Sequence, residues 1–102
     1  MTEITIPFRD DMKKAILEGR KSATTRNKRY GKEGDTFMLD GQKFVLRYIH
    51  KMPLDAVARN LWMEEGCSSK EQFIEIWKQI HPRAGFIARQ LVYVHEFTKV
   101  IE

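Results

Sequence analysis

The chain has 102 residues, of which 42% are hydrophobic and 31% are charged, and its formal net charge is +4. This composition excludes a fibrous or disordered chain, and the length predicts one domain, residues 1–102, around a single small core. Cys67 is the only cysteine, which excludes an intramolecular disulfide and a multi-cysteine zinc site. The sequence shows no secretion signal and no membrane-spanning run, so we expect a cytoplasmic protein with no membrane partner.

The positive charge is concentrated in one segment. Residues 13–32 hold eight Lys or Arg and a single acid, Glu18, whereas the rest of the chain is slightly negative. A local excess of this kind attracts phosphate or another anion, although most charge runs are simply solvated faces.

The first expected element is a short helix in "PFRDDMKKAILEG", residues 7–19. Asp10 is placed to cap it, and Gly19 stands where a left-handed residue ends a helix. Phe8, Met12 and Ile16 recur on one apolar face. The helix is therefore expected to end at Gly19, just before residues 20–32, which hold six of the eight cations and are called the basic stretch below.

The segment "SATTR", residues 22–26, has the β-branched content of a strand. In an extended chain Ser22, Thr24 and Arg26 share one face, whereas Ala23 and Thr25 take the other. Thr25 is therefore expected to point away from the partners of Thr24.

Two apolar runs in residues 35–50 are joined by Asp40 and Gly41, a pair typical of a type I′ hairpin turn. A helix is expected next over residues 54–66, with Asp55 as its cap and Gly66 as its stop.

A further helix is expected in "SSKEQFIEIWKQIHP", residues 68–82, with Ser68 and Glu71 as a capping box and Pro82 at its end. Trp62 and Trp77 recur at the spacing of a helical core, which favours packing over a stacking platform. The β-branched and aromatic residues of 90–101 predict a long final strand.

The expected order is helix, strands, two helices and strand, without regular alternation of strand and helix. The predicted fold class is therefore α+β, built on a small, mostly antiparallel sheet or barrel.

The sequence offers no evident metal or cofactor site. His50, His81 and His95 are far apart and lack a second ligand at metal spacing, and no glycine-rich phosphate loop is present. A lone strand histidine such as His95 is more often structural than catalytic.

Reactive types of side chain gather where the first helix ends, at Lys21, Thr24, Thr25 and Arg26. A threonine hydroxyl is a weak nucleophile unless a base takes its proton. The candidate carboxylates are Glu64 and Glu65, which precede Gly66. By composition alone, a solvated turn is the better explanation of this grouping.

The segment "GRKSATTR", residues 19–26, resembles the Gly-x-Lys-x-x-Thr-x-Arg signature of the ASCH (activating-signal-cointegrator homology) domain family, through Gly19, Lys21, Thr24 and Arg26. The likeness extends to "FRDDMKKAILEG", "YGKEGDTF" and "VYVHEF", so it covers nearly the whole chain, most loosely in the middle third. The resemblance implies a small PUA-like β-barrel decorated by about three helices, and a function related to RNA.

Bacterial single-domain members of similar size act as N(4)-acetylcytidine amidohydrolases, which release acetate and cytidine. The resemblance implies a catalytic triad of Lys21, Thr24 and Glu65, with Glu64 as the alternative acid. The expected substrate-binding residues combine cations for phosphate with an aromatic ring for base stacking: Arg26, Lys28, Arg29 and Tyr30. We expect a modified pyrimidine nucleoside as the partner, no cofactor, and a monomer or weak dimer.

Two mechanisms are open for such an enzyme. In one, Thr24 attacks the acetyl carbonyl while Lys21 takes its proton, although a neighbouring carboxylate favours the charged lysine and so opposes this role. In the other, Lys21 stays charged and binds the oxyanion, while Glu65 activates a water molecule and Thr24 only positions it. The alternative function is a non-catalytic RNA-binding module of PUA-like fold, with RNA as its partner.

Overall fold

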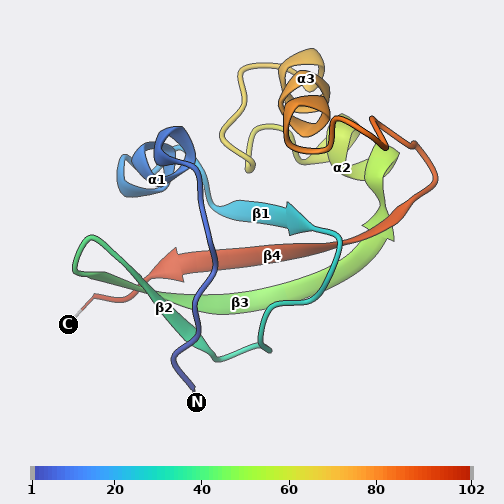
Figure 1. Cartoon of the computed structure of the whole chain (residues 1–102). Coiled ribbons are helices and arrows are strands. Elements are labelled where there is room, and N and C mark those ends of the chain that lie inside the picture. Colours follow the sequence, from blue (N-terminus) through green and yellow to red (C-terminus); the bar gives the residue numbers. More distant parts are fainter. Residues whose placement is uncertain (1, 102) are drawn as a thin grey trace.

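The computed structural model of the protein describes residues 2–101 as a curled antiparallel sheet with three helices (Figure 1). In chain order the elements are α1 (Asp10–Leu17), β1 (Ala23–Arg26), β2 (Thr36–Leu39), β3 (Gln42–Pro53), α2 (Leu54–Asn60), α3 (Lys70–Ile80) and β4 (Leu91–Lys99). The strand order is β1-β4-β3-β2, and every pairing is antiparallel. The predicted α+β class is therefore confirmed. None of these helices is long and apolar enough to span a membrane.

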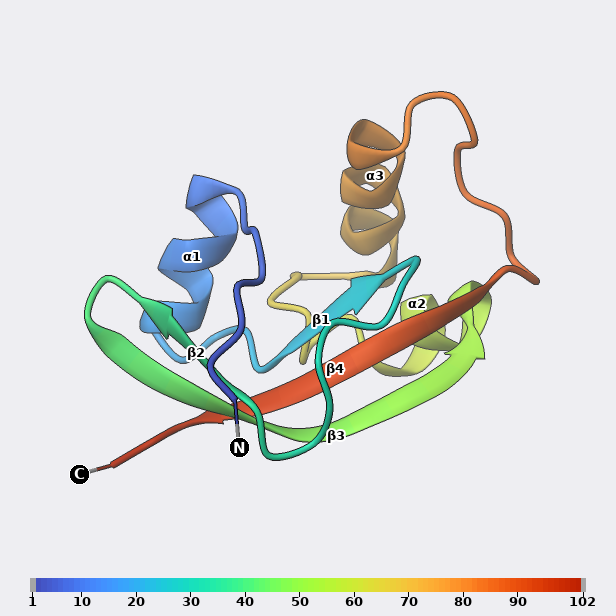
Figure 2. The same ribbon diagram turned by 60° about the horizontal axis from the view of Figure 1, so that its bottom comes forward.

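The sheet curls into a half-barrel because its two long central strands bend (Figure 2). The register of β3 on β4 shifts between Leu46 and Tyr48, which leaves Arg47 as an extra residue in β3. A bulge of this kind bends its strand and increases the local twist.

The turn between β2 and β3 has the predicted geometry. Asp40 and Gly41 both have positive φ angles, 48° and 82°, and Leu39 pairs directly with Gln42. Because both central residues of a type I′ turn need positive φ, an Asp-Gly pair suits this position.

The starts of the helices differ from the predicted caps. Asp10 is the first residue of α1 and not its cap, and the cap position falls on Arg9, whose side chain makes no capping bond. Asp55 likewise lies inside α2, where it pairs with Arg59. The prediction for the end of α1 is confirmed, since Gly19 follows the helix with a φ of 81°.

The second helix is shorter than predicted and the third starts one residue later. α2 ends at Asn60, and residues 61–66 form a run of turns instead of a last helical turn. The cap of α3 is Ser69, whose hydroxyl accepts a hydrogen bond from the Gln72 N–H, while the Gln72 side chain reaches back to the Ser68 N–H. The predicted pair of Ser68 and Glu71 is therefore wrong by one position.

Two apolar clusters fill the fold, one on each face of the sheet, and β4 contributes to both. The first packs α2 and α3 on the sheet and contains Ala23, Leu54, Val57, Ala58, Phe73, Trp77, Val92 and Val94. The second lies beside α1 and the hairpin and contains Ile6, Ile16, Phe37, Leu39, Phe44, Leu46 and Phe97. Of the two tryptophans predicted to pack, Trp77 is buried in the first cluster and Trp62, partly buried, packs against it.

Candidate functional site

A cavity of about 380 Å³ lies over β1, between α1 and α3. In Figures 1 and 2 both helices stand above β1, α1 near the start of the strand and α3 over its end. The residues that line the cavity come from the basic stretch, from both helices and from the segments next to them: Pro7, Arg9, Met12, Lys21, Thr24, Thr25, Arg26, Asn27, Lys28, Tyr30, Glu65, Cys67, Phe73, Ile76, Trp77, Ile80 and His81. The volume lies in the range of roughly 300–1,000 Å³ that small-molecule sites occupy.

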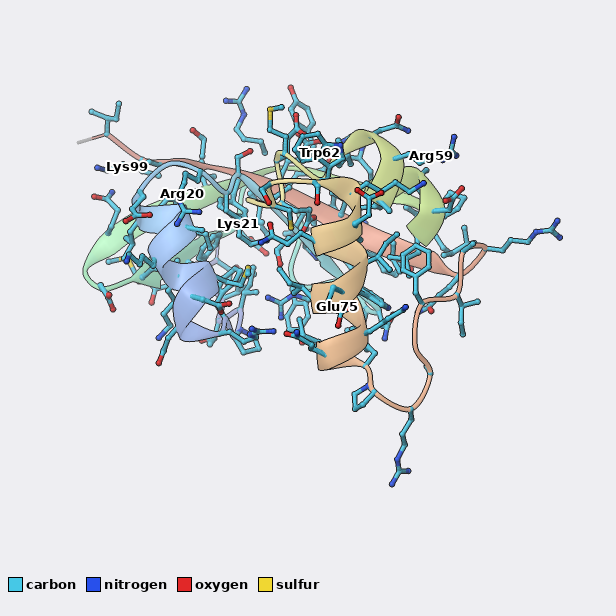
Figure 3. All side chains as sticks on the ribbon, turned by 90° about the horizontal axis from the view of Figure 1, so that it is seen from above. Arg20, Lys21, Arg59, Trp62, Glu75 and Lys99 are labelled. Carbon is cyan, nitrogen blue, oxygen red and sulfur yellow. The ribbon has the colours of Figure 1, made fainter. Side chains whose placement is uncertain are left out.

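A buried ion pair forms one end of this cavity. The Lys21 Nζ lies 3.1 Å from Oε1 of Glu65 and 3.1 Å from the main-chain oxygen of the same residue. Thr25 donates its hydroxyl hydrogen to the other carboxylate oxygen, Oε2, at 2.6 Å. All three side chains are buried, and Figure 3 shows Lys21 between α1 and α3. Both oxygens of Glu65 are therefore held in place by donors, as a buried carboxylate requires.

The backbone brings Glu65 to Lys21. The main-chain oxygen of Glu64 accepts hydrogen bonds from the N–H groups of Ser22 and Ala23, at 2.8 and 3.0 Å, which ties the 61–66 turn to the start of β1. Gly66 has a φ of 84°, and a Cβ at this position would meet the Lys21 Cβ at 2.9 Å. Glycine is required there both for the backbone conformation and for the close approach.

Thr24 lies on the opposite face of β1 from Thr25. It pairs with His95 in the register of β1 on β4, and its Oγ1 accepts a hydrogen bond from the Arg26 Nε at 3.1 Å. The Arg26 guanidinium lies 5.0 Å from the centre of the Phe8 ring and 5.7 Å from that of Tyr30. Because Thr24 accepts from Arg26, its own hydroxyl hydrogen is left to donate to a ligand.

His95 lies on β4 opposite Thr24 and is fully buried. Its Nε2 accepts a hydrogen bond from the Tyr30 N–H at 2.9 Å, so the hydrogen of the neutral ring lies on Nδ1. Nδ1 is 3.3 Å from the main-chain oxygen of Thr24. Burial, together with the nearby Arg26 charge, lowers the pKa of His95. The interpretation of His95 as a structural residue is therefore supported, since both nitrogens are committed to the backbone.

Cys67 also lines the cavity, half-buried beside the ion pair. Burial, and the negative charge of Glu65, raise the pKa of its thiol to about 11. A thiol in this state is protonated at neutral pH and is a poor nucleophile. The structure therefore does not favour Cys67 as a reactive group.

Comparison with solved structures identifies the architecture. The ASCH domain from Lactobacillus crispatus JV V101 superposes with a TM-score of 0.68 over 96% of this chain and 78% of its own, at 14% sequence identity. The chain has the fold of an ASCH domain. The same ASCH-like fold is shared by the hypothetical protein PH0355 (TM-score 0.69, 15% identity, 97% of this chain and 96% of that one). It is also shared by PF0455 from Pyrococcus furiosus (TM-score 0.62, 15% identity, 99% and 96%). No protein-family model and no curated protein matches the sequence.

Within this ASCH fold, the cavity collects most of the residues that the sequence singled out. Six of the seven predicted site residues line it: Lys21, Thr24, Arg26, Lys28, Tyr30 and Glu65. The exception is Arg29, which points to the Gly31 oxygen and to Glu33. Between the two candidate acids, it is the carboxylate of Glu65 that contacts Lys21. Over residues 2–101 no group of side chains suits a metal ion.

Two features of the site were not predicted. Thr25 was expected to face away from it, yet Thr25 and not Thr24 donates to Glu65. The alternation of the strand is as predicted, but the 61–66 turn packs on the Thr25 face. The apolar wall from α3, formed by Phe73, Ile76, Trp77 and Ile80, also lines the cavity. The helical spacing of these residues predicted that they pack in the core, but not that they line a cavity.

Proposed function

We propose that the protein hydrolyses the N(4)-acyl amide of an acylated cytidine, releasing acetate and cytidine from N(4)-acetylcytidine. The observation that carries this proposal is the buried Lys21–Glu65 pair, which shares one cavity with Thr24. Amide hydrolysis needs a proton acceptor for the attacking oxygen, a proton donor for the leaving amine, and donors for the oxyanion. The cavity holds a candidate for each role.

Lys21 fits the role of oxyanion donor. Its Nζ donates to a carboxylate oxygen and to a carbonyl oxygen of Glu65, both at 3.1 Å. An ammonium group held in this way stabilises negative charge that develops on the amide oxygen. The Thr24 hydroxyl supplies a second donor to the same oxygen.

Glu65 fits the role of proton carrier. It takes a proton from a water molecule as the water oxygen bonds to the acyl carbon, which gives a tetrahedral oxyanion held by Lys21 and Thr24. The carbon–nitrogen bond then breaks, and Glu65 returns the proton to the exocyclic nitrogen of cytosine. Thr25 acts as a positioning residue in this scheme, because its 2.6 Å hydrogen bond fixes the Glu65 carboxylate.

Attack by water is favoured over attack by Thr24. Among the residues that the structure describes, His95 contacts the main chain of Thr24, and both of its ring nitrogens already bond to the main chain. A hydroxyl without a base is a weak nucleophile. We therefore expect no acetyl-threonine when the working enzyme is quenched rapidly and analysed by mass spectrometry, whereas a trapped acetyl on Thr24 supports the covalent scheme.

A second candidate function, binding of RNA without catalysis, is favoured by one observation. Arg26, Lys28 and Tyr30 line the cavity together, and Lys28 lies 5.1 Å from the centre of the Tyr30 ring. Cations next to an aromatic ring suit a phosphate and a stacked base.

Acetate release from N(4)-acetylcytidine separates the two functions. We expect turnover by the wild type and a loss of about 100-fold or more in kcat/KM for Glu65→Gln and for Lys21→Gln, since general acid–base catalysis and an oxyanion donor each contribute on that scale. Arg59→Gln is the matched control, because Arg59 lies on α2, outside the cavity lining (Figure 3). No turnover across a panel of acylated cytidines rejects the enzyme. RNA binding that survives Thr24→Val and weakens with salt then favours the binding module.

A further inference from the structure

The charges that line the cavity do not balance. Four cationic side chains line it against one carboxylate: Arg9, Lys21, Arg26 and Lys28 against Glu65. The charge of this carboxylate is already paired with Lys21, and Thr25 donates to its other oxygen. Arg9 has its own partner in Asp11, at 3.0 Å on the surface. Arg26 and Lys28 account for the excess.

No carboxylate within residues 2–101 forms an ion pair with Arg26 or with Lys28. Arg26 instead bonds to the Thr24 hydroxyl and lies against the rings of Phe8 and Tyr30. Lys28 lies against the same Tyr30 ring. Ring faces orient a cation but leave its charge uncompensated.

The environment of Arg26 makes this charge costly. The side chain is half-buried, and burial lowers the pKa of its guanidinium, although the Tyr30 hydroxyl and Glu65 act in the opposite direction. A partly desolvated cation is stabilised by an anion at hydrogen-bonding distance. A guanidinium has five N–H donors and only one is used by Thr24, so donors remain for a ligand. Arginine binds phosphate well because two of its N–H groups match two phosphate oxygens.

We propose that Arg26 and Lys28 form a phosphate subsite, so that the substrate is an acylated cytidine mononucleotide instead of the uncharged nucleoside. This inference rests on the proposed function and deepens it by naming the substrate class.

The direction of β1 agrees with such a substrate. Going along the chain, the reacting groups Lys21 and Thr24 come first, and Arg26 and Lys28 follow. Successive residues of a strand are about 3.3 Å apart, so the Cα of Arg26 lies roughly 7 Å beyond that of Thr24 on the same face. The Arg26 Nε reaches back to the Thr24 hydroxyl at 3.1 Å, and the terminal N–H groups of the guanidinium are those left for a phosphate. The 5′-phosphate of a nucleotide is likewise at the opposite end of the molecule from the N(4) amide. The base then lies against the apolar wall of α3.

A mononucleotide fits the cavity better than a long RNA strand. Residues from both α1 and α3 line the cavity, so its occupant lies between the two helices, which stand over the two ends of β1. Two unpaired cations are enough for one phosphate group, which carries about two negative charges at neutral pH.

The test is the ratio of kcat/KM for N(4)-acetylcytidine 5′-monophosphate to kcat/KM for N(4)-acetylcytidine. We expect a ratio of about ten or more in the wild type, since one charge-assisted hydrogen bond contributes on that scale. The ratio should fall to about one in Arg26→Gln and at least threefold in Lys28→Gln, and stay at the wild-type value in Arg59→Gln. Arg26 also bonds to the Thr24 hydroxyl, so its substitution can change kcat/KM for both substrates, and the ratio cancels a change that is common to both. A wild-type ratio of one or less, with the nucleoside hydrolysed, overturns the phosphate subsite.

Calorimetry with cytidine 5′-monophosphate and cytidine gives a readout that needs no turnover. If neither acetylated compound is hydrolysed, the proposed function fails, and tighter binding of the monophosphate, lost in Arg26→Gln, still supports the subsite. Equal binding of the two ligands overturns it. A third arm uses a short RNA that contains N(4)-acetylcytidine: a higher kcat/KM for this RNA than for the monophosphate overturns the mononucleotide as the substrate.

Discussion

Thr24 and Thr25 are neighbours in the chain, but their hydroxyls serve different partners. Thr25 donates to a buried carboxylate, whereas Thr24 accepts from the half-buried Arg26. Removing a donor from a buried carboxylate leaves a charged acceptor unsatisfied. The two threonines should therefore differ in what their substitution changes.

We predict that Thr25→Val lowers the free energy of unfolding by about 2 kcal/mol and that Thr24→Val lowers it by about 1 kcal/mol or less. Urea denaturation followed by circular dichroism measures both. Thr25→Ser is the control, because it keeps the hydroxyl and should restore most of the stability. A Thr24→Val variant that is less stable than Thr25→Val contradicts the assignment of these hydrogen bonds.

His95 gives a prediction for pH dependence. In the unfolded chain its pKa takes the ordinary value of about 6.5, whereas burial lowers the pKa in the folded chain. The unfolded state therefore binds more protons below that pH, so the stability from a neutral His95 is fully present above about pH 6.5 and declines as the pH falls. Resonances of the His95 ring in an NMR titration should show a midpoint below 6.5, with the hydrogen of the neutral ring on Nδ1. A midpoint at or above 6.5 contradicts the buried neutral histidine.

At the scale of single residues, the sequence predicted which segment forms the site but not how each side chain is used. Strand alternation correctly separated Thr24 from Thr25. It contained no information on which face the 61–66 turn covers, because that depends on the main-chain bonds from Ser22 and Ala23 to Glu64. The partner of a side chain forty residues away is set by packing and not by local pattern.

At the scale of elements, the 61–66 turn holds the site together and Gly66 is its tightest point. We predict that Gly66→Ala lowers the free energy of unfolding by at least about 2 kcal/mol, through left-handed strain of about 1–2 kcal/mol and contact with the Lys21 Cβ at 2.9 Å. It should also reduce acetate release, because Lys21 is displaced. Denaturant unfolding and the activity assay are the measurements.

Gly19→Ala is the matched control for this change. Gly19 has nearly the same φ, 81° against 84°, but a Cβ at Gly19 would meet nothing within 4 Å. Gly19→Ala should therefore show the strain alone and keep its activity. Equal losses of stability and activity in the two variants would mean that the approach of Gly66 to Lys21 has no role.

Local signals decided which elements were predicted well. The hairpin was predicted to the residue because Asp40 and Gly41 specify their turn through their own backbone preferences. The end of α2 was missed because the apolar spacing continues past Asn60, although the chain there leaves the helix. Leu61 and Trp62 still pack against the core cluster of α2 and α3, but from a turn. Apolar spacing records burial, and a compact turn can bury the same residues as a helix.

At the scale of the whole molecule, strand β4 contributes buried residues to both apolar clusters. β4 contributes Val92 and Val94 to the cluster under α2 and α3, and Phe97 to the cluster beside α1. Its neighbours β1 and β3 are hydrogen-bonded to it on both sides. Loss of either cluster should therefore release β4 and with it the other cluster.

This connection predicts a single cooperative unfolding transition, and the tryptophans allow it to be tested. Trp62 and Trp77 both belong to the cluster of α2 and α3, so their fluorescence reports on that cluster alone. Phe37 is fully buried in the other cluster, where it contacts Phe44 and Phe97, and Phe37→Leu should lower the free energy of unfolding by about 1–2 kcal/mol. Because the clusters share β4, tryptophan fluorescence and circular dichroism should shift to the same lower urea midpoint. A fluorescence midpoint that stays at the wild-type value would mean that the clusters unfold independently.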